Sequence, residues 1–243
     1  MLELQSATLA YNSIVAVDSI NLEIKPGEQV CLIGPSGCGK TSLLGLMNGR
    51  LESSSGKVVL DGKELKSLSG KALKTARSKI AWIPQDLGLV PNLRVNQNIA
   101  CGRASEKGFL GLMRSLLLMG SREKEEVADL LKRVGIKEKI FHRVDHLSGG
   151  QQQRVAIARA LYQRPEMILA DEPVSSVDPE RAKSLVELLI GLAREEGQTL
   201  VMSLHDIDLA KRYFDRVIGL REGQVVMDGA PDQIDLRQLY DLS

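Results

Sequence analysis

One segment constrains the fold of this chain more than any other: Gly34-Pro35-Ser36-Gly37-Cys38-Gly39-Lys40-Thr41. It matches the pattern G-x-x-x-x-G-K-[ST], and it lies between a short apolar run at residues 30–33 and a helical pattern at residues 41–48. A glycine-rich turn in this context directs backbone N–H groups at phosphate oxygens, and the helix that follows adds partial positive charge. A chance match is the alternative, and the strand–loop–helix context argues against it. The segment predicts an α/β chain with a nucleotide site.

The side chains of this loop suggest how a nucleoside triphosphate is held. Lys40 can neutralise the β- and γ-phosphates, and the Thr41 hydroxyl can ligate Mg²⁺. Ser42 is a further candidate for a phosphate contact. We therefore expect ATP and Mg²⁺ as cofactors, with these phosphate-binding residues: Gly34, Pro35, Ser36, Gly37, Cys38, Gly39, Lys40, Thr41 and Ser42.

Two adjacent acids, Asp171 and Glu172, follow the apolar run at residues 167–170. Side chains alternate along a strand, so neighbouring acids at its end can have different tasks. Asp171 is expected to hold Mg²⁺, and Glu172 to face the attacking water as a general base. A surface turn is the alternative, since Pro173 follows. The presence of the phosphate loop favours the functional interpretation.

A second anion-binding helix start is predicted at Leu147-Ser148-Gly149-Gly150-Gln151. Ser148 can cap the helix, and the two glycines expose backbone N–H groups. One nucleotide does not need two such sites from the same chain. The natural arrangement is a head-to-tail homodimer, in which this edge covers the γ-phosphate bound by the partner's loop.

These residues resemble the ATP-binding cassette (ABC) ATPase family, because LSGGQQQRVAIARAL is similar to the family signature. The resemblance extends over nearly the whole chain. It implies a P-loop NTPase core with a mostly parallel sheet, an N-terminal antiparallel β region and an inserted α-helical subdomain. It also implies that Ser148, Gly149, Gly150 and Gln151 contact nucleotide.

Four further positions acquire expected roles from this resemblance. Tyr11 corresponds to an aromatic residue that stacks on adenine, and Gln85 to the glutamine that contacts Mg²⁺ or the attacking water. His205 corresponds to a histidine that meets the γ-phosphate. Asp178 belongs to the dimer-interface loop and is expected among the nucleotide-binding residues, although its sequence SSVD departs from the commoner SALD. The expected catalytic set is Lys40, Gln85, Glu172 and His205, and the expected metal ligands are Thr41, Gln85 and Asp171.

Each of these positions also has a plain structural interpretation. Tyr11 could be a partly buried tyrosine near a strand end, Gln85 a turn residue, and His205 a helix-capping residue. Their positions relative to the stronger motifs favour function. His142 and His146 lack such support, so we expect them to be structural or solvated.

Apolar runs alternate with amphipathic stretches, which is typical of an α/β protein. We predict a core formed by residues 1–85 and 159–243, with a helical subdomain at about residues 86–158. Further predicted strands lie at residues 57–60, 79–83, 167–170 and 199–203, with a closing hairpin at 216–220 and 224–227. Further predicted helices lie at residues 108–119, 121–134, 151–163, 180–195 and 232–242.

The composition limits where the protein works and what it binds. Lysine and arginine total 32 against 31 acidic residues, so no general nucleic-acid binding is indicated. The sequence has no apolar run of spanning length and no signal-peptide pattern. The three cysteines show no metal-ligand spacing. With the resemblance, this predicts a peripheral protein on the cytoplasmic face of the inner membrane.

Among ABC ATPases, the chain resembles the ATP-binding subunit of phosphonate importers. The insertion between Gly102 and Gly120 supports this resemblance, whereas Trp82-Ile83-Pro84-Gln85 departs from the usual Phe-Gln form. It implies permease subunits as partners and, indirectly, a periplasmic solute-binding protein. An exporter or lipoprotein-release ATPase, or a soluble non-transport ABC ATPase, is the alternative.

The insertion contains apolar residues at helical spacing: Phe109, Leu112, Met113, Leu116 and Leu117. We expect this face to pack on its own subdomain. The alternative is that the region forms part of a groove for a helix of the membrane subunit.

Overall fold

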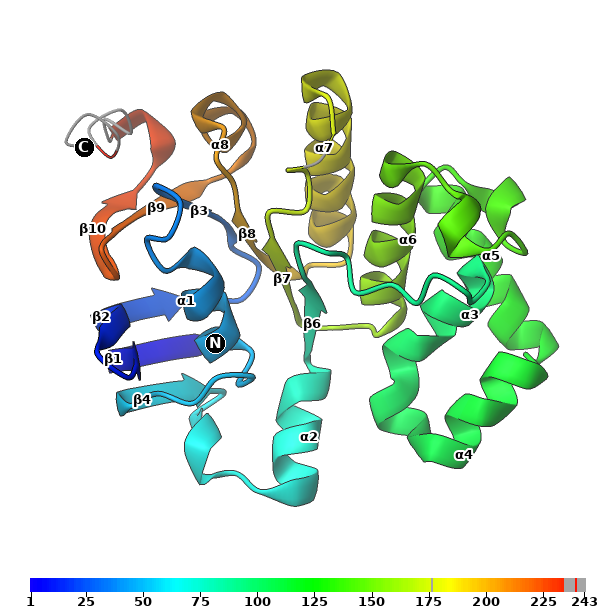
Figure 1. The fold of residues 1–243 in the computed structure, drawn as a ribbon, viewed down its shortest axis with the longest axis horizontal. Helices are drawn as coiled ribbons and strands as arrows, with labels where there is room; N and C mark the ends of the chain where they lie inside the picture. Colours follow the sequence, from blue (N-terminus) through cyan, green and yellow to red (C-terminus); the bar gives the residue numbers. More distant parts are fainter. Residues whose placement is uncertain (176, 234–238, 240–243) are drawn as a thin grey trace.

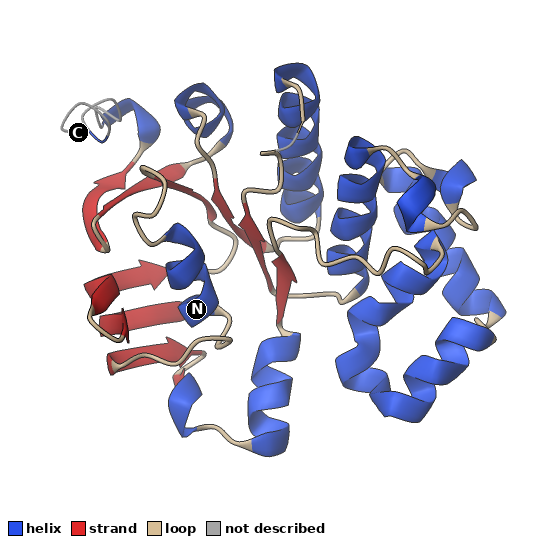
Figure 2. Ribbon diagram, viewed as in Figure 1, coloured by secondary structure: helices blue, strands red, loops and turns tan. Residues whose placement is uncertain are grey.

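Two β-sheets form the frame of the molecule, and helices surround the larger one (Figure 2). The computed structural model describes residues 1–175, 177–233 and 239. The smaller sheet has the order β2-β1-β4-β5 and is antiparallel. Its strands are β1 (Leu2–Tyr11), β2 (Ile14–Ile24), β4 (Ser55–Leu60) and β5 (Lys63–Glu64). The expected N-terminal antiparallel region is therefore confirmed.

The larger sheet has the order β10-β9-β3-β8-β7-β6, and every pair except β9 with β10 is parallel. Its strands are β3 (Gln29–Ile33), β6 (Ile80–Ile83), β7 (Met167–Asp171), β8 (Thr199–Ser203), β9 (Arg216–Arg221) and β10 (Gln224–Gly229). Because parallel strands point the same way, the segments after β3, β6, β7 and β8 leave the sheet at one edge. This edge brings together residues that are far apart in the sequence.

The central strands are buried on both faces, as expected for a parallel sheet covered by helices. In β3, Cys31 and Ile33 contribute to one hydrophobic core, and Val30 and Leu32 to a second. The first core lies against α3 (Val95–Ala100), α5 (Ser121–Arg133), α6 (Gly149–Tyr162) and α7 (Pro179–Glu195). The second joins both sheets to α1 (Lys40–Met47; Figure 1). This alternation explains why β3 is apolar from Val30 to Ile33.

Five of the helices follow the predicted ranges, and three short helices, at Gly70–Ser78, Val95–Ala100 and Ile207–Tyr213, were not predicted. They are α1 (Lys40–Met47), α2 (Gly70–Ser78), α3 (Val95–Ala100), α4 (Ala104–Leu117), α5 (Ser121–Arg133), α6 (Gly149–Tyr162), α7 (Pro179–Glu195) and α8 (Ile207–Tyr213). Short 3-10 turns are η1 (Leu65–Ser67), η2 (Cys101–Arg103), η3 (Lys137–Lys139), η4 (Val144–His146) and η5 (Pro231–Gln233). Most of the terminal helix predicted at residues 232–242 lies outside the described residues.

The inserted helical subdomain is confirmed in the stretch between β6 and β7. Residues 86–147 contain helices and a single isolated bridge, between Arg94 and Arg143. In Figure 1, α3, α4 and α5 lie together at the side of the molecule away from the smaller sheet. The overall architecture is the α/β fold expected from the sequence.

The apolar face of α4 does not pack as expected. Phe109 is 77% exposed, Leu117 is 73% exposed and Met113 is 37% exposed. The helix breaks at Gly108, where φ is 64°, and it is held instead through its polar side. There, the ammonium of Lys107 donates to the Ser115 hydroxyl at 2.7 Å. The expectation that this face packs on its own subdomain is therefore wrong for these three residues.

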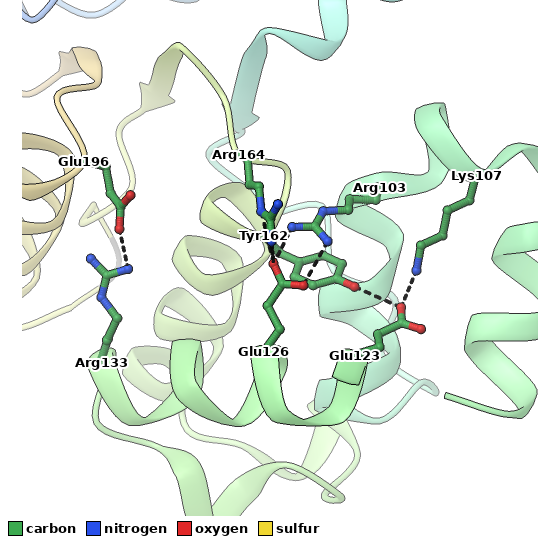
Figure 3. A network of polar contacts seen from close by, with 8 residues as sticks. All are labelled: Arg103, Lys107, Glu123, Glu126, Arg133, Tyr162, Arg164 and Glu196. Carbon is green, nitrogen blue, oxygen red and sulfur yellow. Dashed lines mark hydrogen bonds and ion pairs between the residues drawn. The ribbon is translucent and has the colours of Figure 1, made fainter. Parts of the chain in front are cut away.

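A polar network fixes the insertion to its neighbours (Figure 3). Glu126 of α5 accepts hydrogen bonds from Arg103 (3.0 Å) and from Arg164 beyond the end of α6 (2.7 Å). The Tyr162 hydroxyl donates to Glu123 at 2.9 Å. Burial alone would raise the pKa of Glu126, but hydrogen bonds from the two arginines outweigh it and lower the pKa. The network therefore joins the start of α4, helix α5 and the end of α6.

Candidate functional site

The phosphate loop connects β3 to α1 and curls around its own lysine. Lys40 is 5% exposed, and its Nζ donates to the carbonyl oxygens of Gly34 (2.8 Å) and Pro35 (3.2 Å). Helix α1 starts after Gly39, which has φ of 105° and provides no side-chain cap. A Cβ on Gly39 would lie 2.2 Å from the backbone oxygen of Ala16 in β2. Glycine is therefore required here, and the first N–H groups of α1 are left without a side-chain cap.

The two acids at the end of β7 have different surroundings. Asp171 is 2% exposed, and its Oδ1 accepts a hydrogen bond from the Ser203 hydroxyl at 2.8 Å. Glu172 has a positive φ of 45°, which turns the chain sharply after the strand. Its backbone N–H donates to the Ser203 Oγ at 2.8 Å. The Asp171 carboxylate is thus buried against β8, while the Glu172 side chain points to a different set of partners.

Three candidate residues from other strand ends converge on Glu172. His205 Nε2 lies 2.5 Å from Glu172 Oε1, and Gln85 Nε2 donates to Oε2 at 3.3 Å. Lys40 Nζ is 3.9 Å from Oε1. These residues follow β8, β6 and β3, and Glu172 follows β7, so the sheet edge assembles the cluster. A carboxylate in this position can orient a water molecule and accept its proton.

Oxygen donors suited to Mg²⁺ lie in the same region. Asp171 offers a buried carboxylate, Thr41 an exposed hydroxyl at the start of α1, and Gln85 an exposed side-chain amide. Mg²⁺ is held by one or two protein oxygens together with phosphates and water, so this donor set fits the ion. In the described part of the chain, no group of three His, Cys, Asp or Glu side chains forms a dedicated metal cage.

Tyr11 lies at the end of the β1–β2 hairpin, paired with Ile14. Its side chain is 46% exposed, so it is not part of the core. Ala16, two residues further along β2, contacts the phosphate loop at Gly39. The hairpin therefore presents an exposed aromatic ring close in the chain to a strand that borders the loop.

The signature residues have the local structure of an open helix start. The Ser148 hydroxyl accepts from the Gln151 N–H at 3.4 Å, and Gln151 Oε1 accepts from the Ser148 N–H at 3.1 Å, which forms a capping box. A Cβ added at Gly149 or Gly150 would meet nothing within 4 Å. The backbone at this end of α6 is therefore accessible.

The signature residues are separate from the phosphate loop of the same chain. Among the residues that the structure describes, no hydrogen bond or ion pair joins 148–151 to 34–42. Strands β7 and β8 lie between α1 and α6 in Figure 1. Asp178 caps α7 by accepting a hydrogen bond from the Arg181 N–H at 3.1 Å. Within the described part of the chain, its side chain contacts Arg181 and not the cluster at Glu172. Ser176, two residues before Asp178, lies outside the described residues.

The remaining singled-out residues have plain surroundings. His142 and His146 are exposed, in agreement with the solvated alternative. Cys38 is 6% exposed, and burial raises the pKa of its thiol, so it packs as a neutral group beneath the loop.

Two residues at the site were not singled out from the sequence. Ser203 bridges Asp171 and Glu172, and the Gln153 side chain donates to the Pro173 carbonyl at 2.8 Å from within α6. A hydroxyl in the otherwise apolar run LVMSL is the signal that could have revealed Ser203. For Gln153, the corresponding signal is a glutamine on the side of α6 that is buried.

The described part of the chain contains no helix with the length and hydrophobicity that a membrane span requires.

A profile of the ABC transporter family matches residues 17–175. Phosphonates import ATP-binding protein PhnC 2 of Trichodesmium erythraeum is 42% identical, over 99% of this chain and 93% of its own length. Phosphonates import ATP-binding protein PhnC of Wolinella succinogenes is 41% identical, over 100% of this chain and 88% of its own length.

Solved structures show the same relationship. The dimeric ATP-binding cassette MJ0796, in a post-hydrolysis state bound to ADP and Pi, matches with a TM-score of 0.82 at 32% identity and covers 95% of this chain and 99% of its own. CbiO1 of Clostridium perfringens, part of the ABC transporter complex cbiONQ, matches with a TM-score of 0.82 at 31% identity and covers 96% of this chain and 89% of its own. The chain therefore belongs to the ABC transporter family, as an ATP-binding cassette that binds ATP and hydrolyses it for transport.

Proposed function

We propose that this ATPase is the energy-coupling subunit of a bacterial importer for phosphonates or related phosphorus oxyanions. The observation that carries the solute class is whole-chain identity of 41–42% to proteins named for phosphonate import. The site itself binds nucleotide, so the solute is selected by the membrane and solute-binding partners. An exporter or lipoprotein-release ATPase remains the alternative.

Copurification tests the solute class. The complex with its permease and periplasmic solute-binding protein would be reconstituted in lipid, and ATP hydrolysis measured with a phosphonate, a phosphite, a phosphate ester and a phosphorus-free anion. We expect stimulation by a phosphorus oxyanion alone. Stimulation only by the phosphorus-free anion would overturn the solute class, and failure to copurify with any solute-binding protein would favour the exporter.

For hydrolysis, we propose that the phosphate loop and Lys40 bind the β- and γ-phosphates and that Tyr11 stacks on adenine. Glu172 orients the attacking water and accepts its proton, since its carboxylate lies beside the Lys40, Gln85 and His205 side chains. His205 meets the γ-phosphate. Phosphoryl transfer depends mainly on positioning and charge neutralisation, which these residues supply.

Thr41, Gln85 and Asp171 would hold Mg²⁺, which neutralises phosphate charge when it is bound. This assignment is supported by the oxygen donor set described above. Asp171 is the buried member of the three, and Ser203 already satisfies one of its oxygens. The same carboxylate therefore has a second oxygen for a ligand.

We further propose that two copies form a head-to-tail dimer. In this arrangement Ser148, Gly149, Gly150 and Gln151 of one copy cover the nucleotide held by the loop of the other, with Asp178 at the interface. The accessible start of α6 and its separation from the loop of the same chain support this arrangement. It gives each of the two helix N-termini a phosphate to bind.

A mixing experiment tests the dimer. Lys40→Ala damages the loop, and Ser148→Arg damages the signature, so each variant alone should lack ATPase activity. In a mixed dimer, one nucleotide site combines an intact loop with an intact signature. We expect measurable activity only in the mixture. An inactive mixture of folded, dimer-forming subunits would contradict the head-to-tail arrangement.

The permease is proposed to dock where the helical subdomain meets α2. A groove of about 470 Å³ lies there, and Arg77, Trp82, Cys101, Gly102, Ser105 and Arg159 contribute to its lining. Exposed apolar residues of α4 continue from Ser105 along the insertion: Phe109, Leu110, Met113 and Leu117. An apolar helix face from a membrane subunit fits such a surface. The chain would then lie at the cytoplasmic face of the membrane.

Cysteine crosslinking to the permease tests this surface. Arg103 is unsuitable because it is paired with Glu126, whereas Phe109→Cys and Leu117→Cys change exposed positions. Val226→Cys, on exposed β10 at the other end of the sheet, is the matched control. We expect crosslinks from α4 and none from β10. We propose that the chain divides into a core (1–85 and 159–243) and a helical subdomain (86–158). This division predicts that the yield of the α4 crosslinks changes when ATP binds.

A further inference from the structure

We propose that Ser203 is a positioning residue for ATP hydrolysis, because its single hydroxyl holds both Asp171 and Glu172. The Oγ donates to Asp171 Oδ1 at 2.8 Å and accepts the Glu172 backbone N–H at 2.8 Å. The inference rests on the roles proposed above for these two acids, and it assigns to β8 a part in arranging them.

The sheet register places this hydroxyl where it can reach both acids. Ser203 and Asp171 are opposite each other on the neighbouring parallel strands β8 and β7. Ser203 is 0% exposed, so no water competes for its hydrogen bonds. A serine hydroxyl has one proton and two lone pairs, and this geometry uses the proton for Asp171 and a lone pair for Glu172. The Asp171 carboxylate therefore determines the direction in which the Ser203 hydroxyl proton points.

The hydrogen bond between Glu172 and Ser203 holds the Glu172 backbone in a conformation that residues other than glycine rarely adopt. Glu172 has φ of 45°, in the left-handed region. Its N–H is held by Ser203, and its carbonyl accepts from the Ser175 N–H at 3.2 Å. The turn between these bonds sets the direction of the Glu172 side chain. Strain of this kind persists only where the surroundings determine it, and Ser203 is one of the two determinants.

Glu172 has a second link to β8, through the histidine that contacts its side chain. His205 follows Ser203 by two residues, and its Nε2 lies 2.5 Å from Glu172 Oε1. Glu172 is thus joined to the end of β8 twice, once from its backbone N–H to the Ser203 hydroxyl and once from its side chain to His205. Removing the first link would loosen the geometry of the second.

Packing does not explain a serine at this position. The neighbours of Ser203 in the chain, Val201, Met202 and Leu204, are apolar and fully or almost fully buried. An alanine would fill most of the same space without a polar group to satisfy. The hydroxyl occurs at the one position of β8 whose register partner is the buried acid. A role in hydrogen bonding is the remaining physical reason for it.

Three variants of the full chain test the proposal. Ser203→Ala removes both hydrogen bonds, Ser203→Thr keeps a hydroxyl but adds a methyl group at a fully buried site, and Thr199→Val removes a hydroxyl from the other end of β8. The Thr199 hydroxyl contacts Gly27 and Lys25, far from the acids in the chain. The measurements are kcat and KM for ATP, the Kd of a fluorescent ATP analogue without Mg²⁺, and the Tm.

For Ser203→Ala we expect kcat to fall by about 10- to 100-fold, since small misplacements of reacting groups have effects of this size. The Kd without Mg²⁺ should stay within about twofold, because the phosphate loop is unchanged. Ser203→Thr should have the lower Tm of the two serine variants but the higher kcat. A packing role predicts the opposite: kcat would follow Tm across all three variants, and that result would overturn the proposal.

The Glu172→Gln background separates this inference from the function on which it rests. Because Ser203 holds both acids, adding Ser203→Ala to Glu172→Gln should lower the residual kcat by a smaller factor than Ser203→Ala lowers kcat in the unmodified chain. Full turnover by Glu172→Gln alone would reject the proposed role of Glu172. An inactive Glu172→Gln together with normal turnover in Ser203→Ala would reject the role of Ser203 only.

Discussion

His205 Nε2 lies 2.5 Å from Glu172 Oε1, although 32 positions of the chain separate the two residues. The contact joins the ends of β8 and β7, which are adjacent parallel strands. Gln85 and Lys40 reach the same carboxylate from the ends of β6 and β3. Glu172 is therefore the common acceptor of the cluster.

Glu172→Gln should abolish most ATP hydrolysis while leaving ATP binding intact. The amide cannot accept the proton of the attacking water, and general-base catalysis contributes about 10²–10⁴-fold to rate. Bound ATP should then persist and favour the closed dimer, visible by size-exclusion chromatography. Glu166→Gln, at the opposite end of β7 with an exposed side chain, is the control. Near-normal turnover in Glu172→Gln would contradict the assignment.

Lys40→Ala should weaken ATP binding itself. Its ammonium is the buried cation of the loop, and charge-assisted hydrogen bonds are worth about 1.5–3 kcal/mol each, so the Kd should rise by about tenfold or more. Titration with a fluorescent ATP analogue measures this. Lys71→Ala, on the exposed surface of α2, should leave the Kd unchanged. Equal affinities for the two variants would rule out the proposed contact with phosphate.

Gly39→Ala should destabilise the loop more than Gly27→Ala does. Both glycines have positive φ, which costs an alanine about 1–2 kcal/mol. Only at Gly39 would the new Cβ also clash, at 2.2 Å from the Ala16 oxygen, whereas Gly27 has nothing within 4 Å. Thermal unfolding and ATP titration should show a greater loss for Gly39→Ala. Equal Tm values would mean that β2 can move away from the loop.

Tyr11→Ala should lower the affinity for ATP and ADP alike, and Tyr11→Phe should retain it. Stacking of a base on an aromatic ring is worth about 1–3 kcal/mol, and the exposed ring contributes little to the core. Calorimetric titration with ATP and with inorganic triphosphate separates the contribution of base stacking from that of phosphate binding. The affinity for ATP should depend on the ring and the affinity for triphosphate should not, so an equal loss for triphosphate would indicate a structural effect.

The polar network of Figure 3 should make stability depend on pH in the acidic range. The arginines lower the pKa of Glu126 below its ordinary value of 4.5, so the folded state binds fewer protons than the unfolded state there. The contribution of the Glu126 carboxylate to stability is complete above pH 4.5. It is lost as the pH falls through the lower pKa that Glu126 has in the folded state. Glu126→Gln should therefore reduce the Tm at pH 7, and the difference should shrink at pH 3.

The neighbouring residue Glu125 provides the control for this experiment. It is exposed on α5, and Glu125→Gln should have little effect on the Tm at either pH. A Tm difference for Glu126→Gln that stays constant from pH 7 to pH 3 would show that the carboxylate charge is not the stabilising element.

Local patterns in the sequence predicted several elements well because each pattern carries its own physical cause. The strands β3, β7 and β8 each contain a run of at least three apolar residues, as burial on both faces requires, and α6 begins directly after the capping serine Ser148. Helix α2 was missed because it buries none of its residues, and α3 and α8 because they have only six and seven. Neither presents the long apolar periodicity on which such predictions depend.

The exposure of α4 was predicted wrongly for a related reason. Apolar spacing at Phe109, Met113 and Leu117 indicates a face that seeks a partner, but it does not say whether the partner belongs to the same chain. Here the contacts of Lys107 with Ser115 and Glu123 hold the helix by its polar side. The periodicity itself was interpreted correctly.

By itself, the sequence determined the chemistry available to this protein: the loop that ends in Lys40 and Thr41, the acids that follow β7, and the capped glycine start of α6. These depend on residue type and short spacing, which local backbone geometry translates directly into structure. Only the tertiary structure decided that Lys40, Gln85 and His205 meet at Glu172 and that Ser203 lies opposite Asp171. Strand order and register are set by burial across the whole sheet, so no short segment contains them.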